Sequence, residues 1–279
     1  MSFELLSQEA AASYEKLRRI LSRMEKAAIA CSGGIDSTLL LRAAADIPGL
    51  QITAFTVNSM FVPQEEIAEA AKQSAALGIK HVVIDLDIKK IPQIQKNPPL
   101  RCYHCKKEVF SAIKSKAKSM GIFTILEGSH HDDTADYRPG LKALNELGIA
   151  SPLKDAGFTK KGIREVSRHL GIDTWEKPSS PCLATRIPYD TEITDDLITM
   201  IYESENFIKS QGFMQVRVRA HGNLARIEVK EEDIKKILDP SVRSAIESEL
   251  KNRGFAYITL DMTGYRTGSM NIGIKREEN

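Results

Sequence analysis

The feature that most constrains the fold is the alternation of short apolar segments with helical patterns along the first half of the chain. Apolar runs typical of buried strands occupy residues 27–31, 51–57, 81–86 and 124–127. Helical patterns lie between them at residues 37–45, 64–77 and 106–120. Strands joined through helices pair in parallel by right-handed crossovers, and the helices cover both faces of the sheet. We therefore expect an α/β fold with a doubly wound parallel sheet.

The second half of the chain has a different pattern. Between residues 128 and 194 prolines interrupt short helical segments, and irregular chain of this kind commonly lines a functional site. Helices alternate less regularly with strands after that, and the strands predicted there are at residues 214–220, 224–229 and 257–260. We expect two domains, at residues 1–190 and 191–279, of which the second is a smaller α+β domain with a mostly antiparallel sheet.

The charge balance and the lengths of the apolar runs limit which partners and which cellular compartment we expect for the protein. The 39 lysines and arginines nearly balance the 37 acidic residues, so the net charge of +2 gives no general attraction to nucleic acid. Residues 1–20 read as a charged amphipathic helix, and no apolar run approaches the about 20 residues that span a bilayer. We expect a cytoplasmic protein with no membrane partner, in which the four cysteines do not form disulfides.

A glycine-containing turn separates the first predicted strand from the helix that follows. Its sequence, SGGIDS, comprises Ser32, Gly33, Gly34, Ile35, Asp36 and Ser37. At this place in a βα unit, backbone N–H groups and the positive end of the helix converge, which favours an anion. The glycines let the backbone approach a pyrophosphate, and the serine hydroxyls add donors. Asp36 would repel a bare phosphate, so it implies a cation, most naturally Mg²⁺.

A tight turn with a helix N-cap is the alternative for this loop, because serine and aspartate are favoured there in any case. The complete six-residue string after a first strand resembles a known nucleotide-binding loop, and this resemblance favours nucleotide binding; the string differs from the GxxxxGK[ST] of a Walker loop. Asn58, Ser59 and Gly128 follow predicted strands, at the edge where ligands of open α/β sheets bind. We expect nucleotide contacts there, with ordinary turn residues as the equal alternative.

Three cysteines have positions that suggest chemistry. Cys102 and Cys105 lie three residues apart just before a predicted helix, so both sulfurs could reach one metal ion or cluster. Cys182 lies in a proline-flanked segment with Arg186, a cation that can lower a thiol pKa or bind phosphate. Together the three thiolates could hold three irons of a 4Fe-4S cluster and leave the fourth open.

Two other interpretations of these cysteines remain open. A zinc site of Cys3His type would take His104 or His130 as its fourth ligand. Alternatively, the thiols have no ligand, because cysteine is often simply buried. Cys31 ends a predicted buried strand, and we expect it to be a core residue.

These motifs occur together in one known family. The loop resembles the PP-loop of the ATP pyrophosphatase superfamily, and nearly the whole chain resembles LarE, the PP-loop sulfur transferase of nickel-pincer nucleotide (lactate racemase cofactor) synthesis. The segments that carry the resemblance are SGGIDSTLLLRAA at 32–44, NS at 58–59, DYRPGLKA at 136–143, CLATRIPY at 182–189, VRVR at 216–219, ARIE at 225–228 and GYRTGSMN at 264–271.

The resemblance implies an enzyme that adenylates a carboxylate of pyridinium-3,5-biscarboxylic acid mononucleotide, releases pyrophosphate and replaces the AMP with sulfur. In one branch of the family, which lacks the CxxC pair, the cysteine matching Cys182 gives up its own sulfur. In the other branch three cysteines hold a 4Fe-4S cluster fed by a sulfide source, and Cys102, Cys105 and Cys182 place this chain there. The family further implies ATP and Mg²⁺ as cofactors and a homo-oligomer, a trimer or hexamer.

The resemblance also assigns roles to charged residues. Arg217 and Arg219 alternate along a predicted strand, so both face one way and could hold the substrate phosphate. Glu205 and Glu228 match acidic residues near the substrate and a possible metal site, and Lys106, like Arg186, is a candidate for a phosphate contact. From the residues alone, solvated arginines on an exposed face and ordinary surface carboxylates are the favoured interpretation.

Other functions share parts of this pattern. A tRNA uridine thiolase of the PP-loop superfamily would use three cysteines and a cluster, but it needs an RNA-binding surface, and the balanced charge argues against one. An amide-forming synthetase would use ammonia and would not need the cysteines. A non-catalytic nucleotide-binding regulator is disfavoured because Asp36 and the acceptor motifs are all present.

Overall fold

The chain forms two compact units in the computed structural model, which describes residues 6–135, 139–178, 180–266 and 269. The first unit comprises Met1–Ile88 and Leu100–Ser180, and the second comprises Lys89–Pro99 and Pro181–Asn279. The motif residues that lie outside the described part of the chain are Asp136, Tyr137, Arg138, Thr267, Gly268, Met270 and Asn271.

Four parallel strands form the sheet of the first unit. They are β1 (Lys26–Ala30), β2 (Gln51–Asn58), β3 (Lys80–Asp85) and β4 (Ile125–Leu126), in the spatial order β3-β2-β1-β4. Ala28 of β1 lies opposite both Thr53 of β2 and Ile125 of β4, which puts β1 inside the sheet. The parallel α/β sheet expected from the alternation of strands and helices is confirmed.

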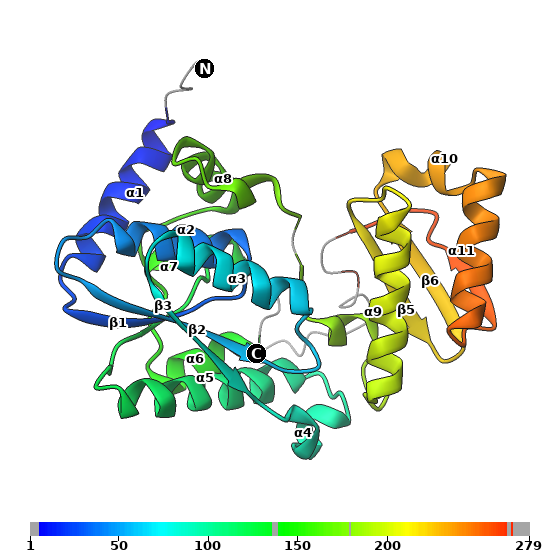
Figure 1. The fold of residues 1–279 in the computed structure, drawn as a ribbon, viewed down its shortest axis with the longest axis horizontal. Coiled ribbons are helices and arrows are strands. Elements are labelled where there is room, and N and C mark those ends of the chain that lie inside the picture. Colours follow the sequence, from blue (N-terminus) through cyan, green and yellow to red (C-terminus); the bar gives the residue numbers. More distant parts are fainter. Residues whose placement is uncertain (1–5, 136–138, 179, 267–268, 270–279) are drawn as a thin grey trace. The chain divides into compact units, whose positions relative to one another are not determined.

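Helices cover both faces of this sheet, as Figure 1 shows. Ala27 and Ile29 of β1 and Leu126 of β4 belong to one core, whereas Ala28 and Ile125 belong to the core on the opposite face. The first core includes residues of α1 (Gln8–Leu21), α2 (Ile35–Ala45), α3 (Gln64–Ala76), α7 (Pro152–Asp155) and α8 (Lys160–His169). The second core includes residues of α5 (Arg101–Ser119) and α6 (Gly140–Leu147). Burial on both faces explains why β1, β2 and β4 read as continuous apolar runs, whereas the edge strand β3 is only partly buried.

Helix α5 begins earlier than the sequence predicts, at Arg101 instead of residue 106. Its N-cap residue, Leu100, has no side-chain oxygen that could accept a hydrogen bond, so the sequence carries no local start signal. Cys102 and Cys105 therefore lie within the first turns of a helix, and the prediction that they precede it is wrong.

The second unit is built on a three-stranded sheet. Its strands β5 (Val216–His221), β6 (Leu224–Val229) and β7 (Tyr257–Leu260) lie in that order, with α9 (Asp195–Ser210) packed against β5. β5 and β6 form an antiparallel hairpin, but β7 is parallel to β6. A mostly antiparallel sheet was therefore the wrong expectation for β7. The chain returns to the start of β7 through α10 (Ile234–Ile237) and α11 (Pro240–Asn252), and such a crossover produces a parallel pair.

A segment from the first half of the chain belongs to the second unit. This segment, Lys89–Pro99, contains the short helix α4 (Pro92–Gln95) and, near its end, Asn97, which is fully buried. The Asn97 side chain donates hydrogen bonds to the carbonyls of Ile187 (3.2 Å) and Pro188 (2.7 Å). These contacts fasten the segment to the stretch that follows Cys182.

Candidate active site

The loop after β1 leads directly into α2. Gly34 occupies the N-cap position and has no side chain to cap the helix, so the first turn of α2 presents its N–H groups in the manner of an anion site. The Ser37 hydroxyl donates to the Gly34 carbonyl (3.1 Å) and accepts from the Ser32 N–H (3.2 Å). These bonds hold the loop in a compact turn at the start of the helix.

Gly33 is the point at which this loop meets α3. It has φ +71°, and a Cβ there would lie 2.4 Å from the Glu66 carbonyl oxygen. The Lys177 ammonium donates to the Gly33 carbonyl (3.0 Å) and to the Glu66 carboxylate (2.7 Å). The loop is therefore held between Glu66 and Lys177, and only glycine fits at position 33 without displacement of the backbone.

A second lysine lies beside Asp36. The Nζ atom of Lys160, the first residue of α8, is 2.6 Å and 2.8 Å from the two Asp36 carboxylate oxygens. The Lys160 N–H also donates to Asp132 (2.7 Å), which ties the start of α8 to the segment after β4. A positive charge thus lies next to Asp36, where the sequence implies a cation. Residues Lys160, Lys177 and Glu66 were not predicted from the sequence.

The carboxyl ends of β2 and β4 carry the other expected nucleotide contacts. A Cβ on Gly128 would lie 3.1 Å from the Ser37 N–H nitrogen, so the chain after β4 runs against the first turn of α2. Asn58 donates to Asp85 (2.7 Å) and accepts from Gln64 (3.2 Å), and Ser59 follows it. Gly128 adjoins the loop, and Asn58 is fixed at the end of its strand.

Glu127 is a buried carboxylate at the end of β4 that the sequence did not single out. It accepts hydrogen bonds from the Ser129 N–H (3.0 Å), the Ser129 hydroxyl (2.7 Å) and the Ser151 hydroxyl. The Lys106 ammonium lies 4.0 Å away. Lys106, a predicted phosphate contact, therefore reaches from α5 to the carboxyl end of β4, next to Gly128.

Cys102 and Cys105 lie one turn apart on α5, so they occupy neighbouring positions on the same side of the helix. Both are partly exposed. The fully buried Arg101 donates to the Cys102 sulfur across 3.6 Å. Tyr103 donates to Glu146 of α6 (2.7 Å), which fixes the start of α5 against its neighbour. The pair is therefore presented on a rigid element.

The other two cysteines have contrasting environments. Cys31 is buried in the core, where loss of hydration raises the pKa of its thiol to about 12, so the prediction of a core residue is confirmed. Cys182 is exposed and belongs to the second unit, next to the 3₁₀ helix η4 (Leu183–Arg186). In the described ranges, no three His, Cys, Asp or Glu side chains are grouped as a metal site.

The predicted arginines and glutamates of the second unit form buried ion pairs. Arg186 binds Glu205 with contacts of 2.8 Å and 2.9 Å, and Arg219 binds Glu228 with contacts of 2.5 Å and 2.8 Å. All four side chains are buried. The interpretation of Arg219 as a solvated arginine, and of the glutamates as surface carboxylates, is therefore wrong. A metal ion could bind either glutamate only by displacing a guanidinium.

Arg217 lies on the same strand as Arg219 and is also buried. Its guanidinium lies 5.2 Å from the centre of the Tyr265 ring, and its Nη1 donates to the Val216 carbonyl (2.6 Å). Burial lowers the pKa of Arg217, and the nearby charge of Arg186 lowers it further. This concentration of buried positive charge is suited to a phosphate group.

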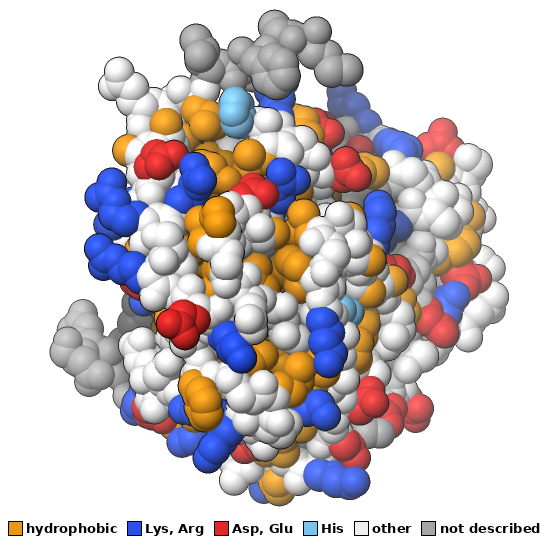
Figure 2. All heavy atoms as spheres, turned by 60° about the vertical axis from the view of Figure 1, so that its left-hand side comes forward, with side chains coloured by type: hydrophobic (Ala, Val, Ile, Leu, Met, Phe, Trp, Pro, Cys, Tyr) orange, Lys and Arg blue, Asp and Glu red, His pale blue; other side chains and the backbone are white. Residues whose placement is uncertain are grey.

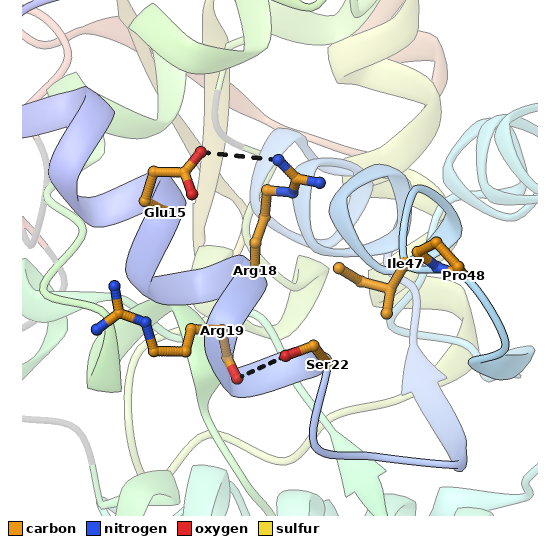
Figure 3. A pocket seen from close by; sticks show the side chains of 6 residues that line it. All are labelled: Glu15, Arg18, Arg19, Ser22, Ile47 and Pro48. Carbon is orange, nitrogen blue, oxygen red and sulfur yellow. Dashed lines mark hydrogen bonds and ion pairs between the residues drawn. The ribbon is translucent and has the colours of Figure 1, made fainter.

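A surface pocket lies elsewhere on the first unit. It has a volume of about 330 Å³ and is lined by Glu15, Arg18, Arg19, Ser22, Ile47 and Pro48 (Figure 3). Ile47 and Pro48 follow the C-terminus of α2, whereas the glycine loop precedes its N-terminus. Arg18 pairs with Glu15 (3.7 Å) within α1. The pocket is thus at the wrong end of α2 to be part of the loop site.

The comparisons with known proteins match nearly the whole chain. No family model matches. An uncharacterized protein of Synechocystis sp. is 37% identical over 257 residues, 92% of this chain and 96% of the relative. The pyridinium-3,5-bisthiocarboxylic acid mononucleotide synthase of Lactiplantibacillus plantarum is 37% identical over 252 residues, 90% of this chain and 91% of the synthase. An uncharacterized protein of Methanocaldococcus jannaschii is 32% identical over 244 residues, 87% of this chain and 92% of the relative.

The helices also bear on membrane association. In the parts of the chain that the structure describes, every helix is too short or too polar to cross a bilayer. Figure 2 shows lysine and arginine side chains dispersed among hydrophobic and acidic ones on the face in view. The dispersion on this face agrees with the balanced charge of the sequence.

Proposed function

The chain belongs to the LarE family, that of the pyridinium-3,5-bisthiocarboxylic acid mononucleotide synthase, and we propose that it is an ATP-dependent sulfur transferase of nickel-pincer nucleotide synthesis. Its acceptor would be pyridinium-3,5-biscarboxylic acid mononucleotide, whose carboxylates are adenylated and then converted to thiocarboxylates. One observation supports the use of ATP: the N-terminus of α2 has no side-chain cap and follows a glycine loop in close contact with α3. The Asp36–Lys160 pair lies at the same N-terminus.

Adenylation requires the acceptor carboxylate to attack the α-phosphate of ATP, with pyrophosphate as the leaving group. The N–H groups of the first turn of α2 would bind phosphate oxygens, and Lys160 and Lys177 supply positive charge at the same loop. Asp36 could bind Mg²⁺ in place of Lys160, because its carboxylate lies at the loop and is partly exposed, unlike the buried glutamates of the second unit. Bound Mg²⁺ would neutralise phosphate charge there, and Lys160 would be released to contact the nucleotide.

The acceptor phosphate would bind in the second unit. Arg217 and Arg219 supply guanidinium groups on one strand, as the sequence predicted, and Tyr265 packs against the first of them. Guanidinium groups bind phosphate with two parallel hydrogen bonds, and burial strengthens such bonds. Because Glu228 holds Arg219, we assign the larger share of phosphate binding to Arg217.

Sulfur delivery would use Cys182 together with Cys102 and Cys105. The chain passes between the two units at Ile88–Lys89, Pro99–Leu100 and Ser180–Pro181, and Cys102 and Cys182 follow the second and the third of these crossings by only a few residues. Both cysteine-bearing segments are thus tethered close to a crossing point. A 4Fe-4S cluster held by the three thiolates would supply the sulfur, while the protein orients the acyl adenylate.

One alternative route needs only Cys182, which is exposed. Its thiolate would displace AMP from the acyl adenylate to form a thioester, and β-elimination would then release the thiocarboxylate and leave dehydroalanine. Mass measurement after turnover distinguishes the routes, because sacrifice of Cys182 removes H2S, about 34 Da. An unchanged mass with more than one product per protein supports the cluster route.

Pyrophosphate release tests the proposed function. With ATP and Mg²⁺, we expect pyridinium-3,5-biscarboxylic acid mononucleotide to stimulate release at least about tenfold, and Asp36→Asn to abolish the stimulation. Gln51→Glu, an exposed change at the opposite end of β2, serves as a control that should keep full activity. Stimulation by tRNA but not by the mononucleotide would contradict the proposal and favour a tRNA thiolase.

A further inference from the structure

The buried side chain of Arg186 forms hydrogen bonds with the backbone of the segment that carries Cys182. Cys182 precedes the 3₁₀ helix η4 and is exposed, whereas Arg186 at the end of η4 is only 2% exposed. Arg186 Nη1 donates to the carbonyls of Pro181 (2.7 Å) and Cys182 (3.2 Å) and to the Thr185 hydroxyl (3.0 Å). One nitrogen atom therefore contacts three groups of the Cys182 segment.

The other side of the same guanidinium is fixed by Glu205. Arg186 Nε and Nη2 donate to the two Glu205 oxygens at 2.8 Å and 2.9 Å, and the Glu205 side chain is almost completely buried on α9. One Glu205 oxygen also accepts from the Val218 N–H of β5 (3.0 Å). The Glu205 carboxylate thus connects α9 and β5 to Arg186. Arg186 in turn is hydrogen-bonded to the Cys182 backbone, so the position of this backbone is fixed relative to α9 and β5.

We propose that Arg186 and Glu205 are positioning residues that hold the Cys182 backbone, and with it the Cys182 sulfur, in one fixed conformation for sulfur transfer. This inference rests on the proposed use of Cys182 in sulfur transfer, whichever route supplies the sulfur. It gives Arg186 a role other than a phosphate contact, and it gives Glu205 a role that needs no metal ion. The donors of Arg186 on both sides of the guanidinium are engaged by these partners.

A contribution to stability does not by itself explain why Arg186 and Glu205 form a buried ion pair. Burial of two charges carries a desolvation penalty, and hydrophobic residues of similar volume can stabilise a core equally well. Hydrophobic side chains cannot hold the carbonyls of Pro181 and Cys182, however. The double variant Arg186→Met/Glu205→Met therefore separates the two roles, because it can retain a packed core and still lose the hold on Cys182.

Helix α9 offers a matched control for Glu205. Glu203, two positions earlier on the same helix, pairs with Arg253, but its side chain is 49% exposed. The changes Glu205→Gln and Glu203→Gln remove the same charge from the same helix. Only the first of them disturbs a carboxylate that is connected to the Cys182 segment.

Hydrogen exchange of the peptide 181–187 tests the positioning role without any activity measurement. The Thr185 N–H bonds the Cys182 carbonyl (3.0 Å), so its protection reports the order of this segment. In Glu205→Gln we expect the exchange rate of this peptide to rise about tenfold or more, and in Glu203→Gln to stay within about twofold of wild type. Thr185→Val removes a 2.8 Å bond to the Cys182 carbonyl and one 3.0 Å contact of Arg186 Nη1, but keeps the Arg186–Glu205 pair and the bonds of Arg186 to the Pro181 and Cys182 carbonyls, so it should show a smaller rise.

Kinetics supply the functional readout. Arg186→Lys keeps the charge but not the planar fork, and we expect its kcat for thiocarboxylate formation to fall about tenfold while the KM for ATP and for the mononucleotide changes less than about threefold. Glu205→Asp should recover part of the rate that Glu205→Gln loses. If the wild type showed no mononucleotide-stimulated pyrophosphate release, the proposed function would fail, and exchange would still decide the positioning role.

Two results would overturn the inference. The first is equal exchange of peptide 181–187 in wild type, Thr185→Val and the Arg186→Met/Glu205→Met protein. The second is full kcat in Arg186→Lys or in the double variant. If Glu205→Gln does not fold, the exchange rates of peptide 181–187 in Thr185→Val and in the double variant still decide the question: raised rates support the inference, and unchanged rates contradict it.

Discussion

The two units use paired charges in different ways. At the glycine loop, Lys160 and Asp36 have side-chain exposures of 30% and 29%, whereas Arg186 and Glu205 in the second unit are each 2% exposed. A partly exposed pair contributes less to stability than a buried one and can exchange partners at smaller cost. A buried pair cannot lose one member without leaving an uncompensated charge. The loop is thus suited to ligand exchange, and the arginine network to fixed geometry.

The largest effect is expected at Glu228, which is fully buried and contacts both Arg219 and Arg226. Glu228→Gln removes the charge that compensates Arg219 and that, together with Asp261, compensates Arg226. We expect the free energy of unfolding of the second unit to fall by about 3–5 kcal/mol in urea titrations. Glu232→Gln, which alters an exposed pair with Lys230, should cost less than about 1 kcal/mol. Equal costs for the two variants would remove the contrast between buried and exposed pairs.

Gly33→Ala should mainly damage ATP use. The new Cβ would collide with the Glu66 carbonyl, so the loop must move away from α3. We expect the KM for ATP to rise at least about tenfold and the protein to lose about 1–3 kcal/mol of stability. Gly121→Ala is a close control, because Gly121 has the same φ of +71° but open space around it. An equal loss of ATP affinity in both variants would show that backbone strain, and not contact with Glu66, is responsible.

Lys160→Met should separate function from stability at the partly exposed pair. Removal of the ammonium would take away the phosphate contact that we propose for Lys160, so we expect the KM for ATP to rise about tenfold. The free energy of unfolding should change by less than about 1 kcal/mol, because the pair with Asp36 is partly solvated. Lys161→Met, at the next position of α8, should change neither quantity. A large loss of stability with unchanged KM would give Lys160 a purely structural role.

The smallest effect is a pH dependence that involves Glu205. Burial alone raises the pKa of this carboxylate, but the charge and hydrogen bond of Arg186 hold it below its usual value. A lowered folded pKa means that the stabilisation is present above the unfolded pKa of 4.5 and is lost as the pH falls through the folded pKa.

Unfolding measurements below pH 4.5 check this sign. Relative to wild type, Glu205→Gln should flatten the acid-side slope of unfolding free energy by at most about 1.4 kcal/mol per pH unit, the limit for one proton. Glu203→Gln is the control. A steeper slope in Glu205→Gln would contradict the assigned direction of the pKa shift.

Local sequence patterns were sufficient for part of this picture. The parallel sheet followed from strand and helix periodicities, and so did the position of Gly128 at the carboxyl end of β4, where the structure shows it beside Asp36. The core position of Cys31 followed from its place at the end of a buried strand. Each of these inferences uses neighbouring residues or a general rule of topology.

The missed features depend on contacts between distant residues. Lys160 and Asp36 are 124 positions apart, and Lys177 and Glu66 are 111 apart, so no local signal marks these lysines among the many others. The burial of Glu205 likewise depends on Arg186 in a different element. The start of α5 was missed because Leu100 is not a capping residue, and the direction of β7 because two helices separate it from β6.

The most direct test of the account is a comparison of two products in a Cys182→Ser protein. If the glycine loop activates the acceptor and Cys182 acts only in sulfur delivery, this variant should still release pyrophosphate when ATP and the pyridinium mononucleotide are supplied, but should form no thiocarboxylate. Thiocarboxylate formation at the wild-type rate by Cys182→Ser would contradict the account.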